Sequence, residues 1–342
     1  MDNGIDTAVV GATGAVGEVM LQILASRNFP VGELFPLASQ RSMGKTVEFK
    51  DKNYPVINLE TFDFSKCKLA LFSAGGEISK QYVPKALEQG CFVVDNTSMF
   101  RNDDAIPLIV SEVNPDALGD NKLIANPNCS TMGMLVAVKP LYDKFGVKRI
   151  DVSTYQAVAG AGKKAISRLS EQTMDMIHMR EIKAEDYDPF PCQIAFNLIP
   201  QIGDFTDNGY TTEEMKMVNE THKILEDSSI GVNVTCVRAS VFYGHSMTVR
   251  MEFANSDWSV DEAREVLSVA PGLTVIDEQK DGGYPTPMNE GGGKDDVYVG
   301  RLRRDISDPR ALNLWLVSDS LRKGAALNSV QIAELALEQN KL

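Results

Sequence analysis

The sequence predicts an α/β protein in which a Rossmann-type doubly wound parallel sheet is joined to an α+β domain built on a mixed or antiparallel sheet. Strand-like apolar runs alternate with helical stretches up to residue 131, and longer strand candidates follow Gly146. Regular alternation of strand and helix is typical of a parallel sheet. We expect one domain over residues 1–131, completed by 319–342, and a second over 132–318.

The expected elements follow from the hydrophobic spacing. The first domain has five strand candidates, at residues 7–10, 34–38, 69–73, 92–95 and 123–125. The second has strand candidates at 147–157, 232–237, 247–253, 297–303 and 312–317, with helices at 163–182, 212–225 and 261–269. A last helix over 321–339 has apolar residues at helical spacing, and we expect it to pack on the first domain.

Composition excludes several classes of protein. The formal net charge of −13 over 342 residues argues against general nucleic-acid binding, which needs a basic face. We find neither an apolar run long enough to span a bilayer nor a signal peptide, so we expect a cytoplasmic protein without membrane contact. The five cysteines are scattered, with no C-x-x-C pair and only three histidines, so we expect neither disulfides nor a metal site.

A glycine-rich turn, G-A-T-G-A-V-G, joins the first strand candidate to the first helical pattern at residues 11–17. Glycines allow a tight turn and the close approach of a pyrophosphate, which then lies on the N–H groups of the helix start. The turn therefore predicts dinucleotide binding, and the alternative is a turn used only for packing. The candidate cofactor contacts are Gly11, Thr13, Gly14, Ala15 and Val16.

The segment after the second strand candidate favours NADP over NAD. An NAD site usually has Asp or Glu there to bind the ribose 2′-hydroxyl, whereas this chain has Ser39, Arg41 and Ser42. Hydroxyls and a guanidinium suit a 2′-phosphate. The alternative for Arg41 is an ordinary solvated loop charge.

Cys129 lies in N-P-N-C-S-T, between a strand-like run at 122–125 and a helical pattern beginning near Ser130. Ser130 or Thr131 can cap that helix, and the partial positive charge of a helix N-terminus lowers the pKa of a nearby thiol. Cys129 is thus a candidate nucleophile. The alternative is a small, buried, inert residue beside a cap.

Seven motifs occur in one order along the chain, and together they resemble the aspartate-semialdehyde dehydrogenase family over nearly its whole length. They are G-A-T-G-A-V-G, A-S-x-R-S, S-A-G-G, N-P-N-C-S-T, A-G-A-G-K, R-x6-H-S and K-G-A-A-L-N. The resemblance implies reductive dephosphorylation of L-aspartyl 4-phosphate by NADPH through a cysteine thioester, in lysine, threonine, methionine and diaminopimelate biosynthesis. It also implies a homodimer or homotetramer.

The resemblance assigns roles to individual residues. Cys129 becomes the nucleophile, His245 the general acid/base, and Gln156 the residue that orients the substrate. The substrate-binding residues would be Arg238 for the α-carboxylate, Arg101 and Lys216 for the phosphate, Glu213 for the amino group, and Asn128. For Glu213 and Lys216 the alternative is a solvated pair at i, i+3 on a helix.

Further cofactor contacts implied by the resemblance are Ser73, Ala74, Gly75, Ala159, Gly160 and Ser320. The chain departs from the family pattern at Ala159, where serine is common, and at Ser320, where asparagine is common. The first change removes one hydroxyl contact to the cofactor, and the second replaces an amide, which can both donate and accept, by a shorter hydroxyl. A third departure, Ala239-Ser240 after Arg238, affects only the local backbone.

Two other functions remain open from the sequence. One is N-acetyl-γ-glutamyl-phosphate reductase, which uses a similar fold, a cysteine and an acyl phosphate one methylene longer. Arg238 together with Gln156 favours the aspartyl substrate. The other is a dinucleotide-binding protein without catalysis, against which the presence of both Cys129 and His245 argues.

Overall fold

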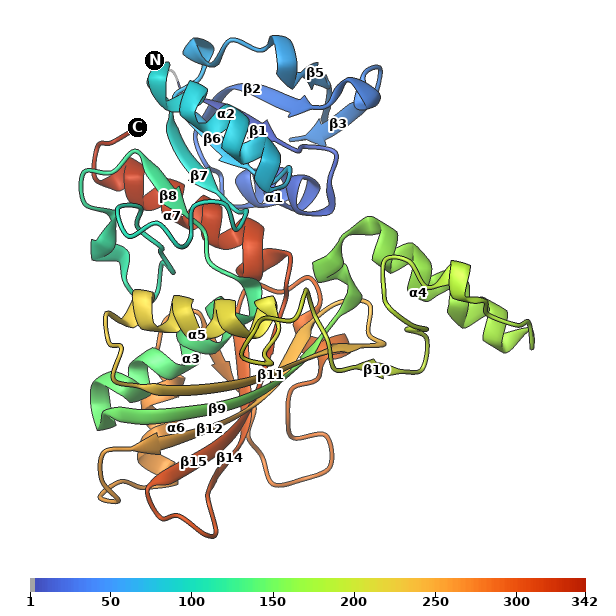
Figure 1. Cartoon of the computed structure of the whole chain (residues 1–342). Coiled ribbons are helices and arrows are strands. Elements are labelled where there is room, and N and C mark those ends of the chain that lie inside the picture. The colour runs from blue at the N-terminus through green and yellow to red at the C-terminus, as the bar shows by residue number, and fades with distance from the viewer. Residues whose placement is uncertain (1–3) are drawn as a thin grey trace. The chain divides into compact units, whose positions relative to one another are not determined.

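The structure is a computed structural model that describes residues 4–342, and the chain divides into two compact units. Unit 1 runs to Pro127 and includes Ala325–Leu342, and unit 2 is Asn128–Gly324 (Figure 1). These divisions lie a few residues from the ones expected at 131 and 318. The first differs because the helix that begins at Cys129 belongs as a whole to unit 2.

Unit 1 is built on a six-stranded sheet whose neighbouring strands are all parallel, in the order β5-β2-β1-β6-β7-β8. The predicted doubly wound parallel sheet is therefore confirmed. Its strands are β1 (Ile5–Val10), β2 (Val31–Ala38), β5 (Ile57–Asn58), β6 (Leu69–Phe72), β7 (Phe92–Asp95) and β8 (Leu123–Ala125). At their carboxyl ends, β1 leads into the glycine turn, β2 into Ser39 and β6 into Ser73. Because these strands are parallel neighbours, the three predicted cofactor segments lie at the same edge of the sheet.

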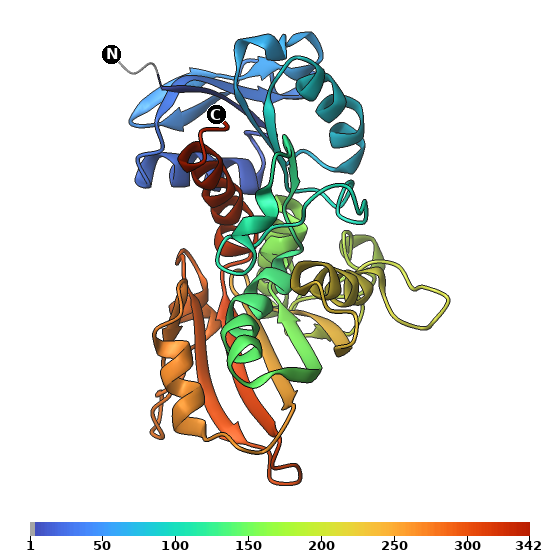
Figure 2. The same cartoon turned by 90° about the vertical axis from the view of Figure 1, so that its left-hand side faces the viewer.

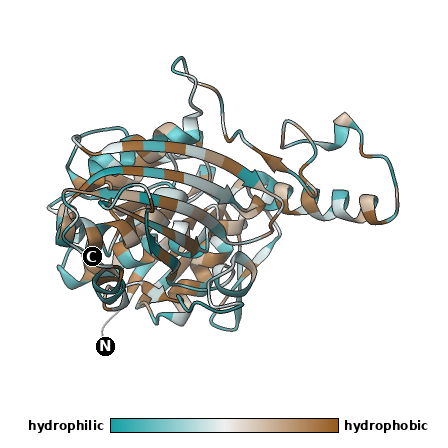
Figure 3. Cartoon of the chain, turned by 90° about the horizontal axis from the view of Figure 1, so that it is seen from below, coloured by the Kyte–Doolittle hydropathy of each residue, from teal (hydrophilic) through white to brown (hydrophobic). Residues whose placement is uncertain are grey.

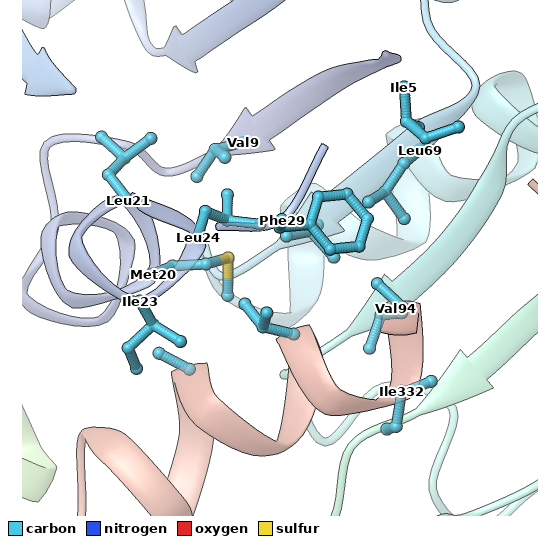
Figure 4. Packing of buried hydrophobic residues seen from close by; sticks show 14 of the residues in the cluster. Ile5, Val9, Met20, Leu21, Ile23, Leu24, Phe29, Leu69, Val94 and Ile332 are labelled. Atoms are coloured by element: carbon cyan, nitrogen blue, oxygen red, sulfur yellow. The ribbon is translucent and has the colours of Figure 1, made fainter. Parts of the chain in front are cut away.

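The main core of unit 1 lies between this sheet and helices α1 (Ala15–Ser26) and α7 (Leu327–Glu338). Figure 4 shows Val9 of β1, Leu24 of α1 and Val94 of β7 packed around Phe29, with Ile332 entering from α7. A second apolar cluster lies between the sheet and α2 (Gly76–Glu88). The predicted packing of the last helix on the first domain is confirmed.

Two details of unit 1 differ from the sequence prediction. A short antiparallel hairpin, β3 (Thr46–Phe49) and β4 (Lys52–Pro55), and the two-residue strand β5 were not predicted, because such short strands carry little periodicity. The last helix is shorter than the predicted 321–339, since residues Arg322–Ala326 form a single π-helical turn before it.

Unit 2 is built on a seven-stranded mixed sheet in the order β10-β11-β9-β12-β15-β14-β13. Only β11/β9 and β13/β14 are parallel, and the other neighbours are antiparallel. The strands are β9 (Val147–Gln156), β10 (Leu198–Ile199), β11 (Gly231–Ala239), β12 (His245–Phe253), β13 (Leu273–Val275), β14 (Val297–Arg304) and β15 (Ala311–Ser318). The predicted mixed sheet is confirmed, with β10 and β13 added as short edge strands.

Helices α3 (Cys129–Phe145), α5 (Thr212–Leu225) and α6 (Val260–Ser268) pack on one face of this sheet (Figure 2). The long strands accordingly alternate between hydrophobic and hydrophilic residues (Figure 3). A capping box of Thr211 and Glu214 fixes the start of α5 at the predicted residue. Helix α4 (Lys163–Ile177) projects beyond the sheet and ends earlier than the predicted 182 (Figure 1).

Within residues 4–342, no helix combines the length and the apolar character needed to cross a bilayer.

Candidate active site

Cys129 is the first residue of α3. Asn128 caps this helix, because its side-chain Oδ1 accepts hydrogen bonds from the backbone N–H groups of Ser130 at 2.9 Å and Thr131 at 3.3 Å. The expectation that Ser130 or Thr131 caps the helix is therefore wrong: both lie inside the first turn, two and three positions after the cap. With Asn128 as the cap, the half-buried thiol of Cys129 lies in the first turn of α3, at the positive end of the helix.

His245, the first residue of β12, brings its imidazole to the thiol. Its Nε2 lies 3.3 Å from Cys129 Sγ, and the side chain is fully buried. Burial, reinforced by the positive charge of Arg238, lowers the pKa of His245 to about 3. The imidazole is therefore neutral at physiological pH. The structure thus brings together the two residues that were predicted to be the catalytic pair.

The peptide unit of Ala157 joins His245 to Arg238. Its N–H donates to His245 Nδ1 at 3.0 Å, and its carbonyl accepts from Arg238 Nη1 at 2.7 Å. Gly160 passes close to both side chains, because a Cβ there would lie 3.2 Å from His245 Nε2 and 3.4 Å from Arg238 Nη1. Burial lowers the pKa of Arg238, although a guanidinium stays protonated in proteins. The thiol therefore shares its surroundings with a buried positive charge.

The carboxylate of Glu213 accepts hydrogen bonds from three of the other predicted residues. Its Oε1 accepts from Asn128 Nδ2 at 2.8 Å and Gln156 Nε2 at 3.1 Å, and its Oε2 accepts from Lys216 Nζ at 3.0 Å. Burial alone would raise the pKa of Glu213, but Lys216 and these hydrogen bonds outweigh it and hold the pKa at about 2. The alternative of a solvated pair does not hold for Glu213, which is buried, whereas Lys216 is partly exposed.

Glu220 is a buried residue of this cluster that was not predicted. Its Oε2 accepts the backbone N–H of Asn128 at 2.6 Å. A signal was available in the sequence, since residues seven apart share one face of a helix and Glu213 and Glu220 have that spacing. The acids of α5 therefore point inward, as the burial of both side chains shows.

The cluster combines the groups that covalent catalysis on an acyl compound needs. A thiol at a helix N-terminus is a nucleophile, a buried guanidinium can pair with a carboxylate of the substrate, and a buried carboxylate can pair with an amino group. All of these residues belong to unit 2, on α3, α5, β9, β11 and β12. Among residues 4–342, no group of three or more His, Cys, Asp or Glu side chains is placed to hold a metal ion.

Unit 1 has a cavity of about 730 Å³ at the carboxyl edge of its sheet. Eight predicted cofactor residues line it: Gly11, Thr13, Gly14, Ser39, Arg41, Ser42, Ser73 and Ala74. Residues that were not predicted also line it, among them Glu60, Gln81, Tyr82 and Lys85. Lys85 gives the cavity a second cation beside Arg41. The sequence held a signal for Lys85, because a helix that directly follows the Ser73 turn can direct a cationic side chain towards the same edge of the sheet.

The glycine turn has the backbone that phosphate binding requires. Gly11 has φ +90°, and a Cβ there would lie 3.0 Å from the Ser73 carbonyl, so only glycine fits without strain. At Gly17 a Cβ would lie 2.2 Å from Gly11 O, so this glycine lets α1 pack on the turn. No side chain caps α1, which starts with Ala15 and Val16 after Gly14. Its first N–H groups can therefore bind an anion.

The remaining predicted residues lie in both units. Arg101 is a buried residue of unit 1 whose Nη2 donates to Asn96 O at 2.8 Å, and Gly75 precedes α2 with φ +98°. Ala159 is buried in a short 3-10 turn of unit 2. Ser320, also in unit 2, is buried, and its Oγ makes no hydrogen bond with the described residues.

Comparison with family models gives two matches that together cover most of the chain. Residues 6–121 match the semialdehyde dehydrogenase NAD binding domain, and residues 138–323 match the semialdehyde dehydrogenase dimerisation domain. The two matched regions correspond to the two units of the structure.

Individual proteins are similar over the whole length. Aspartate-semialdehyde dehydrogenase of Legionella pneumophila is 54% identical over 98% of this chain and 96% of its own. The structure of aspartate semialdehyde dehydrogenase II from Vibrio cholerae complexed with ASA is 50% identical, with a TM-score of 0.94 over 98% of each chain. A probable aspartate-semialdehyde dehydrogenase from Pseudomonas aeruginosa is 32% identical with a TM-score of 0.93, covering 98% of this chain and 99% of its own.

Proposed function

The chain belongs to the aspartate-semialdehyde dehydrogenase family, and we propose that it reduces L-aspartyl 4-phosphate with NADPH to L-aspartate 4-semialdehyde and phosphate. This reaction belongs to lysine, threonine, methionine and diaminopimelate biosynthesis. The observation that carries the proposal is the cluster around Cys129, in which Sγ lies 3.3 Å from His245 Nε2 and Arg238 binds the same peptide as His245.

The chemistry begins at sulfur. The Cys129 thiolate attacks the acyl carbon of the substrate, the C–S bond forms, and the C–O bond to phosphate breaks with its electron pair leaving on phosphate. NADPH, when bound, supplies the hydride that reduces the resulting thioester. The tetrahedral carbon then collapses, so that the C=O bond re-forms and the C–S bond breaks with its electron pair returning to sulfur.

The side chains around the thiol would bind the amino-acid part of the substrate. Arg238 would pair with the α-carboxylate through its planar guanidinium, and Glu213, ionised and buried, would pair with the amino group. Gln156 and Asn128, which both donate to Glu213, would hold that carboxylate in place. We assign Lys216 and Arg101 to the phosphate because both are cationic.

We assign the cavity of unit 1 to NADP. Arg41 and Lys85 line it together with the hydroxyls of Ser39 and Ser42, and this combination suits a 2′-phosphate. Gly11 and the open start of α1 suit the pyrophosphate. The structure of aspartate semialdehyde dehydrogenase from Candida albicans, which is 23% identical and has the same fold, was solved with NADP. We also propose Ala159, Gly160 and the hydroxyl of Ser320 as cofactor contacts, as the family resemblance implies.

We propose that the protein is a homodimer or homotetramer. The matched description of residues 138–323 as a dimerisation domain supports self-association through unit 2.

The deciding experiment is phosphate-dependent reduction of NADP, followed by absorbance, with L-aspartate semialdehyde and separately with N-acetylglutamate semialdehyde. Turnover of the first aldehyde alone is expected. Turnover of the acetylated aldehyde would instead identify an N-acetyl-γ-glutamyl-phosphate reductase. Absence of turnover with both aldehydes would indicate a binding protein.

A cysteine variant tests the nucleophile. Cys129→Ser should abolish turnover and still bind NADP. Cys192→Ser, at a half-buried cysteine elsewhere, is the matched control.

A further inference from the structure

Asp95 is a buried carboxylate with no part in the proposed chemistry. It is the last residue of β7, at the carboxyl edge of the parallel sheet of unit 1, and it is 0% exposed. Acidic side chains are almost never fully buried unless their oxygens are paired, because loss of hydration is costly. The partners of this carboxylate therefore show what it holds in place.

Three donors bind the two oxygens of Asp95. Oδ1 accepts from Ser79 Oγ of α2 at 2.7 Å and from the backbone N–H of Thr97 at 3.2 Å, and Oδ2 accepts from Thr97 Oγ1 at 2.7 Å. None of these three partners is a cation. Burial raises the pKa of Asp95, and the hydrogen bonds and the positive charge of Arg101 oppose this rise. Asp95 therefore binds the start of a loop and faces, through charge, the arginine at its end.

Two successive contacts between a side chain and the backbone fold this loop. Asp95 binds the N–H of Thr97, and the Thr97 hydroxyl, which donates to Asp95, accepts in turn from the N–H of Met99 at 3.2 Å. Contacts of this kind fix the path of a turn. At the end of the turn, Arg101 Nη2 donates to the carbonyl of Asn96 at 2.8 Å.

The carbonyl that accepts from Arg101 belongs to a residue that is itself held in place. The backbone N–H of Asn96 donates to Phe72 O at 2.9 Å. Its side-chain Oδ1 accepts from Asn126 Nδ2 at 2.8 Å and from Ser329 Oγ at 2.9 Å. Because Arg101 is also buried, few other positions are open to its side chain.

We propose that Asp95 is a positioning residue for phosphate binding, which folds residues 96–101 and holds the Arg101 guanidinium ready for the phosphate of the substrate. The inference rests on the proposed function, because it takes Arg101 as a phosphate ligand. Asp95 would act through Arg101. An arginine loses side-chain entropy when it binds an anion, and a side chain that is already oriented loses less.

The direction of the effect separates this role from two others. Removal of a negative charge near an anion site would, by charge alone, strengthen the binding of phosphate. A residue that only supports the fold would change the binding of phosphate, NADP and the aldehyde alike. If Asp95 positions Arg101, its loss weakens the binding of phosphate and leaves the other two unchanged.

The test is the steady-state kinetics of Asp95→Asn in the phosphate-dependent oxidation of L-aspartate semialdehyde by NADP. We expect the KM for phosphate to rise about fivefold or more, and the KM values for NADP and the aldehyde to stay within about twofold of the wild type. The exposed Asp104→Asn, in the segment that follows Arg101, is the control and should change none of them. An unchanged or lower KM for phosphate, or an equal rise in all three, would overturn the inference.

Thr97 offers a second pair of variants that keeps the buried charge. Thr97→Val removes the hydroxyl that binds both Asp95 and the N–H of Met99, so the KM for phosphate should rise. Thr97→Ser keeps that hydroxyl and should retain the wild-type value. A wild-type KM for phosphate in folded Thr97→Val would contradict the inference.

Binding of inorganic phosphate to the intact enzyme, followed by phosphorus-31 NMR without turnover, distinguishes this inference from the proposed function. Arg101→Ala should weaken the binding strongly, and Asp95→Asn should weaken it less. Loss in Arg101→Ala with no change in Asp95→Asn would overturn the inference and leave the proposed function intact. If both variants weaken binding but the wild type turns over neither aldehyde, the proposed function fails and the inference stands. If Arg101→Ala binds phosphate as the wild type does, the inference fails with its premise.

Discussion

The backbone N–H of Asn128 donates to Glu220 Oε2 at 2.6 Å, so a buried carboxylate of α5 fixes the residue that precedes the nucleophile. The side chain of the same asparagine donates to Glu213, which lies two turns earlier on the same face of α5, and accepts from two N–H groups of α3. Asn128 is thus bound at its backbone and at both atoms of its amide. The start of α3, and with it Cys129, is held by contacts from α5.

The bond to Glu220 leads to a stability prediction. Glu220→Ala leaves the buried N–H of Asn128 without this acceptor, and an unsatisfied buried donor costs about 1–3 kcal/mol. Glu220→Gln keeps an acceptor oxygen and should lose less. Urea unfolding measures both, with the exposed Glu226→Gln as control. The assignment fails if Glu220→Ala unfolds at the same urea concentration as the wild type.

The fold could largely be predicted because its long elements carry strong periodicity. The five predicted strands of unit 1 all lie in its parallel sheet, and α5 covers the predicted residues 212–225. The elements that were missed, β3, β4, β5, β10 and β13, are two to four residues long. Strands of that length are fixed by their partners in the sheet, and local sequence does not determine them.

The site was predicted less completely, because some of its contacts come from the backbone or from ordinary helix positions that no motif marks. Cys129, His245, Arg238 and Glu213 could be recognised from motifs, but the Ala157 peptide that joins two of them has no side-chain signature. Glu220 and Lys85 likewise lie on ordinary amphipathic helices. Their roles depend on which face of a helix meets which loop, which only the folded backbone defines.

Glu213 predicts an acid-sensitive contribution to stability. Its folded pKa of about 2 lies below the ordinary value of 4.5, so the unfolded chain binds a proton first as pH falls. The stabilisation is present above pH 4.5 and is lost as pH falls towards 2. Glu213→Gln should therefore show a smaller drop in unfolding free energy over that range than the wild type. The exposed Glu48→Gln serves as control, and an equal drop in Glu213→Gln would contradict the prediction.

We expect Arg41 and Lys85 to determine the preference of the enzyme for NADPH over NADH. Removing either cation from the cavity should weaken the contact with the 2′-phosphate and raise the KM for NADPH about tenfold or more, the scale of a charged hydrogen bond. The KM for NADH, which lacks that phosphate, should change little. Steady-state kinetics of Arg41→Ala and Lys85→Ala with both cofactors provide the comparison, and the exposed Lys66→Ala is the control. Equal losses with NADH would mean that these residues do not bind the phosphate.

His245 predicts a second pH dependence, at higher pH than that of Glu213. Its folded pKa of about 3 lies below the ordinary 6.5, because the ring is buried and faces Arg238. Between those values the unfolded chain binds a proton that the folded protein does not, so stability falls as pH drops below 6.5. His245→Asn keeps an acceptor for the Ala157 N–H but has no such ionisation. Its unfolding free energy should therefore change less between pH 6.5 and 4.5, above the range of Glu213. The exposed His178→Gln should behave as the wild type, and a wild-type slope in His245→Asn would show that the folded protein takes up the proton at His245 after all.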